Sequence, residues 1–315
     1  MIDVGIHAAQ EQFTPSELLS VIELAEDLGF AAVSSSDHLA PLTGAGGQAG
    51  FAWSWLGAAM ARTRLPFSVV TAPGQRYHPV VTAQAIATLA EMFPGRFVPA
   101  LGSGQLVNER MTGERWPAKR VRRQRLRESA EMIRELLAGR TVTHDGLVRA
   151  SAARLFTVPD VPPPLFAAAM TPSSACDAAT WADGLVTMGC SPRRVREVVS
   201  AYRDAGGRGP AHLQVHVALA PSLEEGRQLA LRHWRAHALP PSLVEDLPTP
   251  EAFDRATRMT TVEEVAGSVL VSDEPAALAA DLHRLAEEGV DRVLVHHVGP
   301  DQERFLQRLG PALRG

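Results

Sequence analysis

The sequence predicts a (β/α)8 barrel that forms one domain over residues 1–315. Three observations predict it. The chain of 315 residues is long enough for one such barrel. Short apolar runs rich in Val, Leu and Ala recur eight times, and longer stretches of helical period separate most of them. Repeated strand and helix produces a parallel sheet that closes most naturally into a barrel, with an open doubly wound sheet as the alternative.

Eight short apolar runs are the expected strands. Strands of a parallel barrel are buried on both faces, so continuous apolar runs are typical of them. In chain order the runs cover residues 2–8, 31–35, 66–71, 96–101, 164–169, 184–188, 212–218 and 292–297.

The first expected helix has the clearest start and end signals. Thr14-Pro15-Ser16-Glu17 is a capping box with proline at the first helical position, and Gly29 ends the helix. Leu18, Ile22 and Ala25 follow at helical spacing and predict its buried face. Further helices are expected over residues 79–92, 120–138, 193–205, 222–237, 275–288 and 302–313.

Two regions do not fit the repeat and predict insertions after strands 4 and 7. Residues 139–163 contain two short β-rich runs around Asp145-Gly146, a hairpin signal, and then a proline-rich connection. In residues 238–268, four prolines break the chain before two expected helical pieces. We expect this second insertion to fold over the mouth of the barrel.

Composition excludes several classes of partner. The formal net charge is -4 and the pI is about 6.3, so no basic surface is expected for nucleic acid. No apolar run reaches the roughly 18 residues that a membrane helix needs. The two cysteines, Cys176 and Cys190, show no CxxC spacing. We therefore expect a cytoplasmic protein that contacts neither membrane nor nucleic acid.

The loops after the strands are where a parallel barrel holds its ligands. The segment Ser36-Asp37-His38, followed by a glycine-rich stretch at residues 44–47, puts an acid and an imidazole at a strand end. The segment Gly102-Ser103-Gly104-Gln105 follows the fourth strand, and its glycines permit close approach of an anion or a planar ring. The acid and the imidazole at a strand end indicate an enzyme. Neither a dinucleotide fingerprint nor a P-loop is present, so these residues alone do not identify a cofactor.

Several segments occur in the order that one protein family shows. They are Glu11-Gln12-Phe13, Ser36-Asp37-His38, Phe51-Ala52-Trp53-Ser54-Trp55, Arg76-Tyr77-His78-Pro79, Pro94-Gly95-Arg96, Gly102-Ser103-Gly104, Asn108-Glu109 and Trp116-Pro117. On these segments the chain resembles the bacterial-luciferase-like TIM-barrel oxidoreductases, in the branch of the glucose-6-phosphate dehydrogenases that depend on the deazaflavin coenzyme F420. The resemblance is strong over the first two thirds of the chain and weaker beyond.

The resemblance implies roles for individual residues. His38 matches the catalytic histidine beside the reactive ring carbon, and Glu11 matches a carboxylate near the substrate. Positions that hold F420, or FMN as the alternative cofactor, correspond to Asp37, Val69, Val70, Ala72, Gly102, Gly104, Asn108, Ala168, Ala169 and Met170. The resemblance also implies a homodimer.

The departures from the family pattern concern the substrate. Gln105 replaces a proton-donating Glu, and an amide exchanges no proton near neutral pH. Leu42 replaces an active-site Trp, and Ser191 replaces a phosphate-binding Lys, whereas Arg255 keeps a second cationic place. With Leu42 and Arg255, Trp53 completes the expected substrate residues, although Trp53 also suits helix packing. Glucose 6-phosphate is therefore not the expected substrate.

The remaining groups predict hydride transfer. An imidazole with an ordinary pKa of about 6.5 exchanges protons at cytosolic pH, so His38 can manage the proton that accompanies the hydride. We expect reduction of an activated C=C or C=N bond in a small molecule or peptide, such as a dehydroamino-acid residue of a peptide natural product. An FMN-dependent monooxygenase and a flavin-binding or partner-binding barrel without turnover are the alternatives.

Histidine pairs raise the question of a metal, and we expect none. His212 and His216 share one strand face, and His233 and His237 lie one helical turn apart, but no carboxylate or cysteine constellation accompanies them. Core or surface positions are the simpler interpretation. The basic run from Lys119 to Arg127 spreads around a helix and predicts a solvated or subunit-facing surface.

Overall fold

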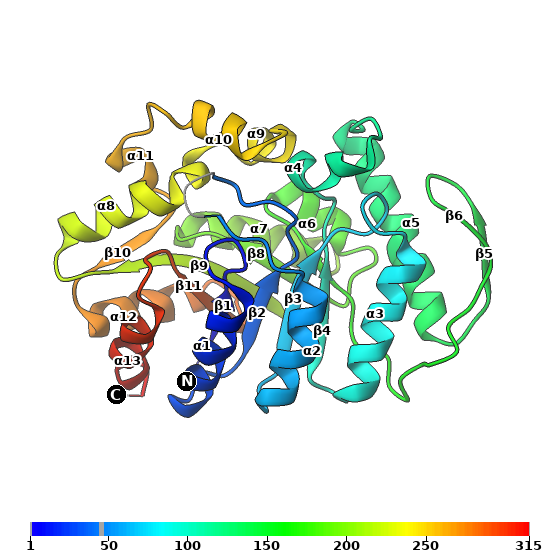
Figure 1. Cartoon of the computed structure of the whole chain (residues 1–315), viewed down its shortest axis with the longest axis horizontal. Coiled ribbons are helices and arrows are strands. Elements are labelled where there is room, and N and C mark those ends of the chain that lie inside the picture. Colours follow the sequence, from blue (N-terminus) through cyan, green and yellow to red (C-terminus); the bar gives the residue numbers. More distant parts are fainter. Residues whose placement is uncertain (1, 44–46, 315) are drawn as a thin grey trace.

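Eight parallel strands close into a barrel in the computed structural model, which describes residues 2–43 and 47–314 (Figure 1). Most of the glycine-rich stretch 44–47 thus lies outside the described residues. Each expected strand is confirmed. The barrel strands are β1 (Asp3–Ala8), β2 (Val33–Ser36), β3 (Phe67–Thr71), β4 (Phe97–Leu101), β7 (Phe166–Ala168), β8 (Gly184–Met188), β9 (Ala211–Leu219) and β11 (Arg292–His297). β11 pairs with both β9 and β1, which closes the ring.

Helices surround this barrel and cover its outer face (Figure 1). The predicted helices are confirmed with shifts of a few residues at their ends. Those that follow the barrel strands are α1 (Pro15–Asp27), α2 (Ala52–Arg62), α3 (Pro79–Met92), α5 (Lys119–Leu137), α6 (Pro172–Ala178), α7 (Pro192–Asp204), α8 (Leu223–Trp234), α12 (Pro275–Ala286) and α13 (Gln302–Ala312).

Two of these helices, α2 and α6, were not predicted. The residue before α2, Phe51, makes no side-chain cap, so the usual start signal is missing. Its buried residues Ala52, Leu56 and Ala59 nevertheless follow helical spacing. α6 spans only seven residues and depends on a capping box from Thr171.

The capping box predicted for α1 is present. Thr14 accepts from the backbone N–H of Glu17, whose carboxylate accepts from the backbone N–H of Thr14. Leu18 and Ile22 are almost fully buried against the barrel, and burying each such side chain stabilises the fold by roughly 1.5–3 kcal/mol.

The first insertion is the expected hairpin. β5 (Val142–Asp145) and β6 (Arg149–Ala153) pair antiparallel between α5 and β7. They stand apart from the barrel sheet (Figure 1).

The second insertion contains three α-helices where two helical pieces were expected. After η2 (Arg235–Ala238) come α9 (Pro241–Asp246), α10 (Pro250–Ala256) and α11 (Val262–Ala266). Threonine side chains cap the starts of α10 and α11, which explains why the segment forms one helix more than its prolines alone indicate. A short strand, β10 (Leu270–Ser272), then pairs in parallel with the carboxyl end of β9. α9 contacts α4 (Leu106–Glu109), which continues into η1 (Arg110–Thr112).

No helix within residues 2–43 and 47–314 combines the length and the apolar character needed to cross a membrane. The core lies between the barrel and its helices, with Val33, Val69 and Leu213 fully buried in it. A smaller apolar cluster of Ala100, Phe166 and Val186 joins β4, β7 and β8.

Candidate active site

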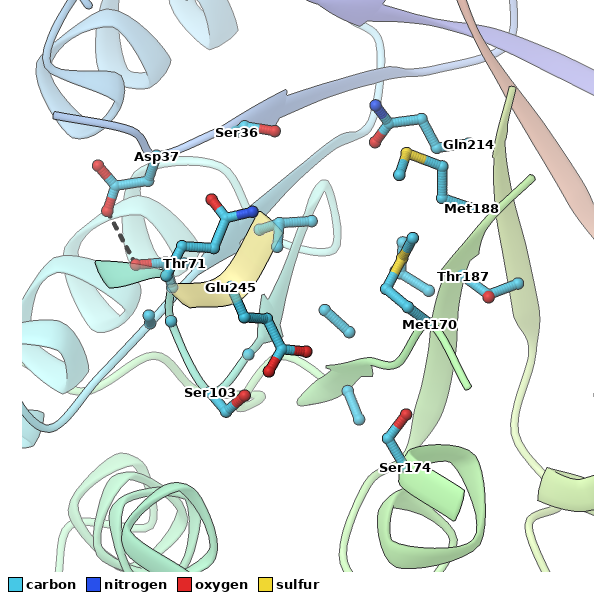
Figure 2. A pocket seen from close by; sticks show the side chains of 18 of the residues that line it. Ser36, Asp37, Thr71, Ser103, Met170, Ser174, Thr187, Met188, Gln214 and Glu245 are labelled. Atoms are coloured by element: carbon cyan, nitrogen blue, oxygen red, sulfur yellow. Dashed lines mark hydrogen bonds between the residues drawn. The ribbon is translucent and has the colours of Figure 1, made fainter. Parts of the chain in front are cut away.

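A cavity of about 250 Å³ opens at the carboxyl ends of the barrel strands. Residues after β1 to β4 form one part of its lining, and β7, β8 and β9 form another. α5, η2 and α9 also contribute, the last through Glu245. Figure 2 shows Glu245, Ser103 and Met170 around this cavity. The second insertion therefore reaches the cavity, as expected of a segment that covers the mouth.

His38 and Glu11 form an ion pair in the cavity through His38 Nδ1 and a Glu11 carboxylate oxygen. Burial lowers the pKa of His38, but the charge and hydrogen bond of Glu11 outweigh burial and raise this pKa above 6.5. Burial raises the pKa of Glu11, but the charge and hydrogen bond of His38, together with smaller contributions from His237 and His7, outweigh burial and lower this pKa below 4.5. Both shifts favour the charged forms of the pair, a carboxylate on Glu11 and an imidazolium on His38.

Asp37 is held by four side chains. Its Oδ2 accepts hydrogen bonds from Thr71 Oγ1 at 2.8 Å and Trp53 Nε1 at 3.1 Å. Tyr77 Oη donates to Oδ1 at 3.2 Å, and the Arg76 guanidinium lies 3.2 Å from Oδ2. Figure 2 shows the Asp37 carboxylate turned toward Thr71. This carboxylate has its charge and hydrogen bonds satisfied by the protein.

Arg76 also compensates Glu109. The Arg76 backbone N–H donates to Glu109 Oε2 at 2.7 Å, and its guanidinium lies 3.9 Å from Oε1. Burial raises the pKa of Glu109, although Arg76 opposes this rise. We call Asp37, Arg76 and Glu109 the carboxylate wall. It places one buried cation between two carboxylates.

Asn108 links the loops after β2 and β4. Its Oδ1 accepts from the backbone N–H groups of Leu39 and Ala40 at 2.9 and 3.2 Å. Its Nδ2 donates to Gln105 Oε1 at 3.2 Å. Gly104 adopts a φ of +79°, which disfavours other residues at this turn. The side-chain amide of Asn108 thus fixes the glycine-containing loop that follows β4.

Four imidazoles form a second group, which we call the imidazole floor. They are His7, His216, His237 and His296 from β1, β9, η2 and β11. Burial lowers the pKa of His7 and of His237 to about 4. Burial holds the pKa of His216 and of His296 well below its usual value. All four rings are therefore neutral near pH 7, whereas Glu11 raises the pKa of His38.

Neighbouring histidines of β11 face opposite ways, as predicted. His296 lies 2.9 Å from His216 by their Nδ1 atoms, whereas His297 stacks on Phe305 of α13 with ring centroids 4.5 Å apart. His216 is thus a cavity residue, although the sequence favoured a structural role for it. No group of three or more His, Cys, Asp or Glu residues in the described part of the chain is arranged to hold a metal ion.

The basic run at 119–127, predicted to form a solvated or subunit-facing surface, partly faces the interior of this chain instead. Lys119 and Arg123 line the cavity, and Arg122 is 3% exposed. Glu245 of α9 pairs with Lys119 at 2.7 Å and with Arg122 at 2.6 Å. These ion pairs connect residues more than 120 positions apart, which a local charge pattern does not reveal.

Most predicted site residues line this cavity. They are Glu11, Asp37, His38, Leu42, Val70, Ala72, Gly102, Gly104, Gln105, Asn108, Ala168 and Met170. The sequence did not single out as site residues Lys119, Arg123, Thr187, Met188, Gln214, Trp234 and Glu245, which also line it.

Four predicted residues do not line the cavity. Val69 and Ala169 are buried in the main core, because successive residues of a strand alternate between faces. Trp53 donates to Asp37 and packs edge-on against Phe97, with ring centroids 6.1 Å apart, so it supports the wall. Arg255 is exposed on α10.

The fold and this cavity define a (β/α)8-barrel protein with its ligand site at the carboxyl ends of the strands. A family model described as luciferase-like monooxygenase matches residues 1–292, and the chain belongs to this luciferase-like family. It is an oxidoreductase, as the resemblance implied.

Curated relatives match nearly the whole chain. The F420-dependent glucose-6-phosphate dehydrogenase of Nakamurella multipartita is 36% identical over 321 residues, covering 98% of this chain and 94% of the relative. The enzyme of the same name from Beutenbergia cavernae is 36% identical over 323 residues, covering 98% and 95%.

Solved structures agree with the fold. An F420-dependent secondary alcohol dehydrogenase in complex with an F420-acetone adduct has a TM-score of 0.92 at 26% identity, covering 100% of this chain and 99% of that one. The coenzyme F420-dependent tetrahydromethanopterin reductase of Methanopyrus kandleri has a TM-score of 0.79 at 19% identity, covering 99% and 98%. At that identity the second likeness shows the fold alone.

Proposed function

We propose that this chain is an F420-dependent oxidoreductase that reduces an activated C=C or C=N bond in an uncharged substrate. The single observation that carries the proposal is that the His38–Glu11 ion pair shares its cavity with a group of Gly and Ala residues, which we call the slot. F420, rather than FMN, is its cofactor, since the curated relatives and the 26% identical structure all name F420.

The slot fits a flat ring. Five of its lining residues have no side chain larger than a methyl group, and they come from the ends of β3, β4 and β7. They are Ala72, Gly102, Gly104, Ala167 and Ala168. Small residues on one wall leave room for a planar ring to lie against the backbone. At the rim, Arg123 pairs with Asp177, whose side chain is 54% exposed, and such a surface pair exchanges easily for an anionic tail.

His38 is the proton donor. When bound, the deazaflavin supplies the hydride, and the substrate then needs one proton. His38 Nδ1 is held by Glu11, so Nε2 is the atom that offers a proton to the substrate. Because Glu11 raises the pKa of His38, it favours the protonated imidazole that a proton donor needs. Glu11 keeps the ring oriented and charged while the proton is delivered.

The surroundings of this pair favour an uncharged substrate. A smaller cavity adjoins the first and shares Glu11, Leu42, Trp234 and His237 with it. Among its described lining residues there is no Lys or Arg. The two positions considered for binding a sugar phosphate supply no cation to the cavity. Ser191 is the N-cap residue of α7 and lies outside the cavity lining, and Arg255 is exposed. A dehydroamino-acid residue in a peptide is uncharged and needs no Lys or Arg among these residues.

A binding and turnover experiment tests the proposal. Fluorescence titrations with F420 and with FMN measure which cofactor binds, and we expect F420 to bind more tightly. Protein loaded with reduced F420 is then mixed with N-acetyldehydroalanine methylamide, and oxidation of the cofactor is followed by absorbance. The oxidised complex mixed with glucose 6-phosphate is the control, in which we expect no reduction of F420. Tighter binding of FMN, or turnover only with the sugar phosphate, contradicts the proposal.

A further inference from the structure

The amide of Gln12, just after β1, can face only one way. Its Nε2 donates to the Val298 carbonyl oxygen over 3.0 Å, and its Oε1 lies 2.6 Å from His296 Nε2. Turning the amide over would place its oxygen against the Val298 carbonyl, where two acceptors would meet. Gln12 Oε1 therefore accepts a hydrogen bond, and His296 Nε2 carries the proton.

His296 passes this constraint to His216. Burial lowers the pKa of both histidines well below 6.5, so each neutral ring has one N–H and one lone pair. The proton of His296 is on Nε2, so its Nδ1 is an acceptor. His216 Nδ1 lies 2.9 Å from that atom and must donate to it. The lone pair of His216 is therefore on Nε2.

His216 lines the main cavity, and the partner recorded for its Nε2 is a poor one. Met188 Sδ lies 2.7 Å away, but a thioether has no proton to donate. Met188 itself lines the cavity, and Figure 2 shows it beside Gln214, to which it is paired in the sheet. Its unbranched side chain has three rotatable bonds and can turn aside for a ligand.

The His216 ring is held in this orientation by aromatic neighbours. The centroids of Trp234 and His237 lie 4.9 and 4.8 Å from its own. Because His216 is 2% exposed, an acceptor left without a donor here carries a desolvation cost that a ligand can relieve. The low pKa of His216 means that it accepts a hydrogen bond and does not take up the proton.

We propose that His216 Nε2 is a specificity-determining hydrogen-bond acceptor, which selects substrates that carry an O–H or N–H donor in addition to the reacting carbon. This inference rests on the proposed function and narrows its substrate class. The amide N–H of a dehydroamino-acid residue supplies such a donor, and so does a hydroxyl group near the reacting bond. An ether does not.

The first test reads the tautomer directly and needs no cofactor. The ring nitrogens of 15N-histidine-labelled protein are observed by NMR, and His216→Phe assigns the signals of His216. We expect a protonated Nδ1 and an unprotonated Nε2. Gln12→Leu removes the acceptor that sets the relay, so we expect this pattern to be lost. A protonated Nε2 in the unsubstituted protein overturns the proposal.

The second test adds two probes to the labelled protein without F420. Hydroxyacetone carries a hydroxyl donor, and methoxyacetone has a methyl ether in its place. We expect hydroxyacetone to move the His216 Nε2 signal and to bind about tenfold more tightly, as one hydrogen bond to a buried acceptor predicts. His216→Phe is expected to bring this ratio near one. An Nε2 signal that hydroxyacetone leaves unmoved overturns the proposal.

His297→Phe is the matched control for His216→Phe. His297 neighbours His296 in sequence but stacks on Phe305 outside the barrel, and it does not line the cavity. We expect this variant to keep the preference for hydroxyacetone. Equal loss of the preference in both variants contradicts a direct role for His216. Because neither test uses the deazaflavin, a failure here is distinct from a failure to bind F420.

Discussion

The carboxylate wall and the imidazole floor both contribute residues to the main cavity, but they stabilise their buried polar groups in different ways. The wall keeps its charges and compensates them, with Arg76 between Asp37 and Glu109. The floor avoids charge, because burial keeps the rings of His7, His216, His237 and His296 neutral.

This difference indicates that the wall supports the loops, whereas the floor recognises a ligand. Asp37 in the wall has its hydrogen bonds filled by protein groups, so its first role is to hold the loops in place. In the floor, the lone pair on His216 Nε2 has no proper donor. A buried group whose hydrogen bonds are filled by the protein stays in place, whereas an acceptor without a donor discriminates among ligands.

Removing the cation of the wall is expected to have the largest effect. Arg76→Met leaves two buried carboxylates without their shared partner, and we expect a loss of about 3–5 kcal/mol in the free energy of unfolding. Urea denaturation measures it. Arg120→Met, on the exposed side of α5, is the control and should change stability little. A loss below about 1 kcal/mol for Arg76→Met would show that the wall is not held by charge.

Removing the proton donor is expected to affect turnover and leave cofactor binding nearly intact. His38→Ala should lower turnover by at least about 100-fold, which is typical for loss of a general acid. The dissociation constant for F420 should change only a few-fold. Stopped-flow absorbance and fluorescence titration measure the two quantities, with His283→Ala on α12 as the control. Unchanged turnover would exclude His38 from the mechanism.

The smallest expected effect concerns pH and the interior histidines. Burial lowers the pKa of His212 to about 4, so between pH 6.5 and 4 the unfolded chain binds a proton that the native protein does not. Native stability should therefore fall as the pH drops through this range. His212→Phe should make the fall less steep by roughly 1 kcal/mol per pH unit. Urea denaturation between pH 6.5 and 4.5 measures the slope, and an unchanged slope would contradict this assignment.

The barrel could be predicted from the sequence because its signals are local. Each strand is a short apolar run, and the capping box at Thr14 marks the start of α1. α2 escaped prediction because Phe51 provides no cap, although Trp55 and Met60 continue its buried helical face.

The site could be predicted only in part. His38 and Glu11 were identified through the family resemblance, but their ion pair is seen only in the structure. The roles of Lys119 and Arg122 depend on Glu245, which approaches only in the folded chain. The tautomer of His216 likewise depends on Gln12 and on β11, which lie far apart in the sequence.

The barrel closes between its first and last strands, β1 and β11, through an ordinary parallel ladder, and α13 packs beside α1. Figure 1 shows both ends of the chain on the side opposite α9 and α10. The first and last strands are therefore neighbours like any other pair of strands in the barrel. A circular permutant with a linker at this seam and a new opening near Phe156 and Val161, which are 92% and 80% exposed, keeps every strand pairing intact.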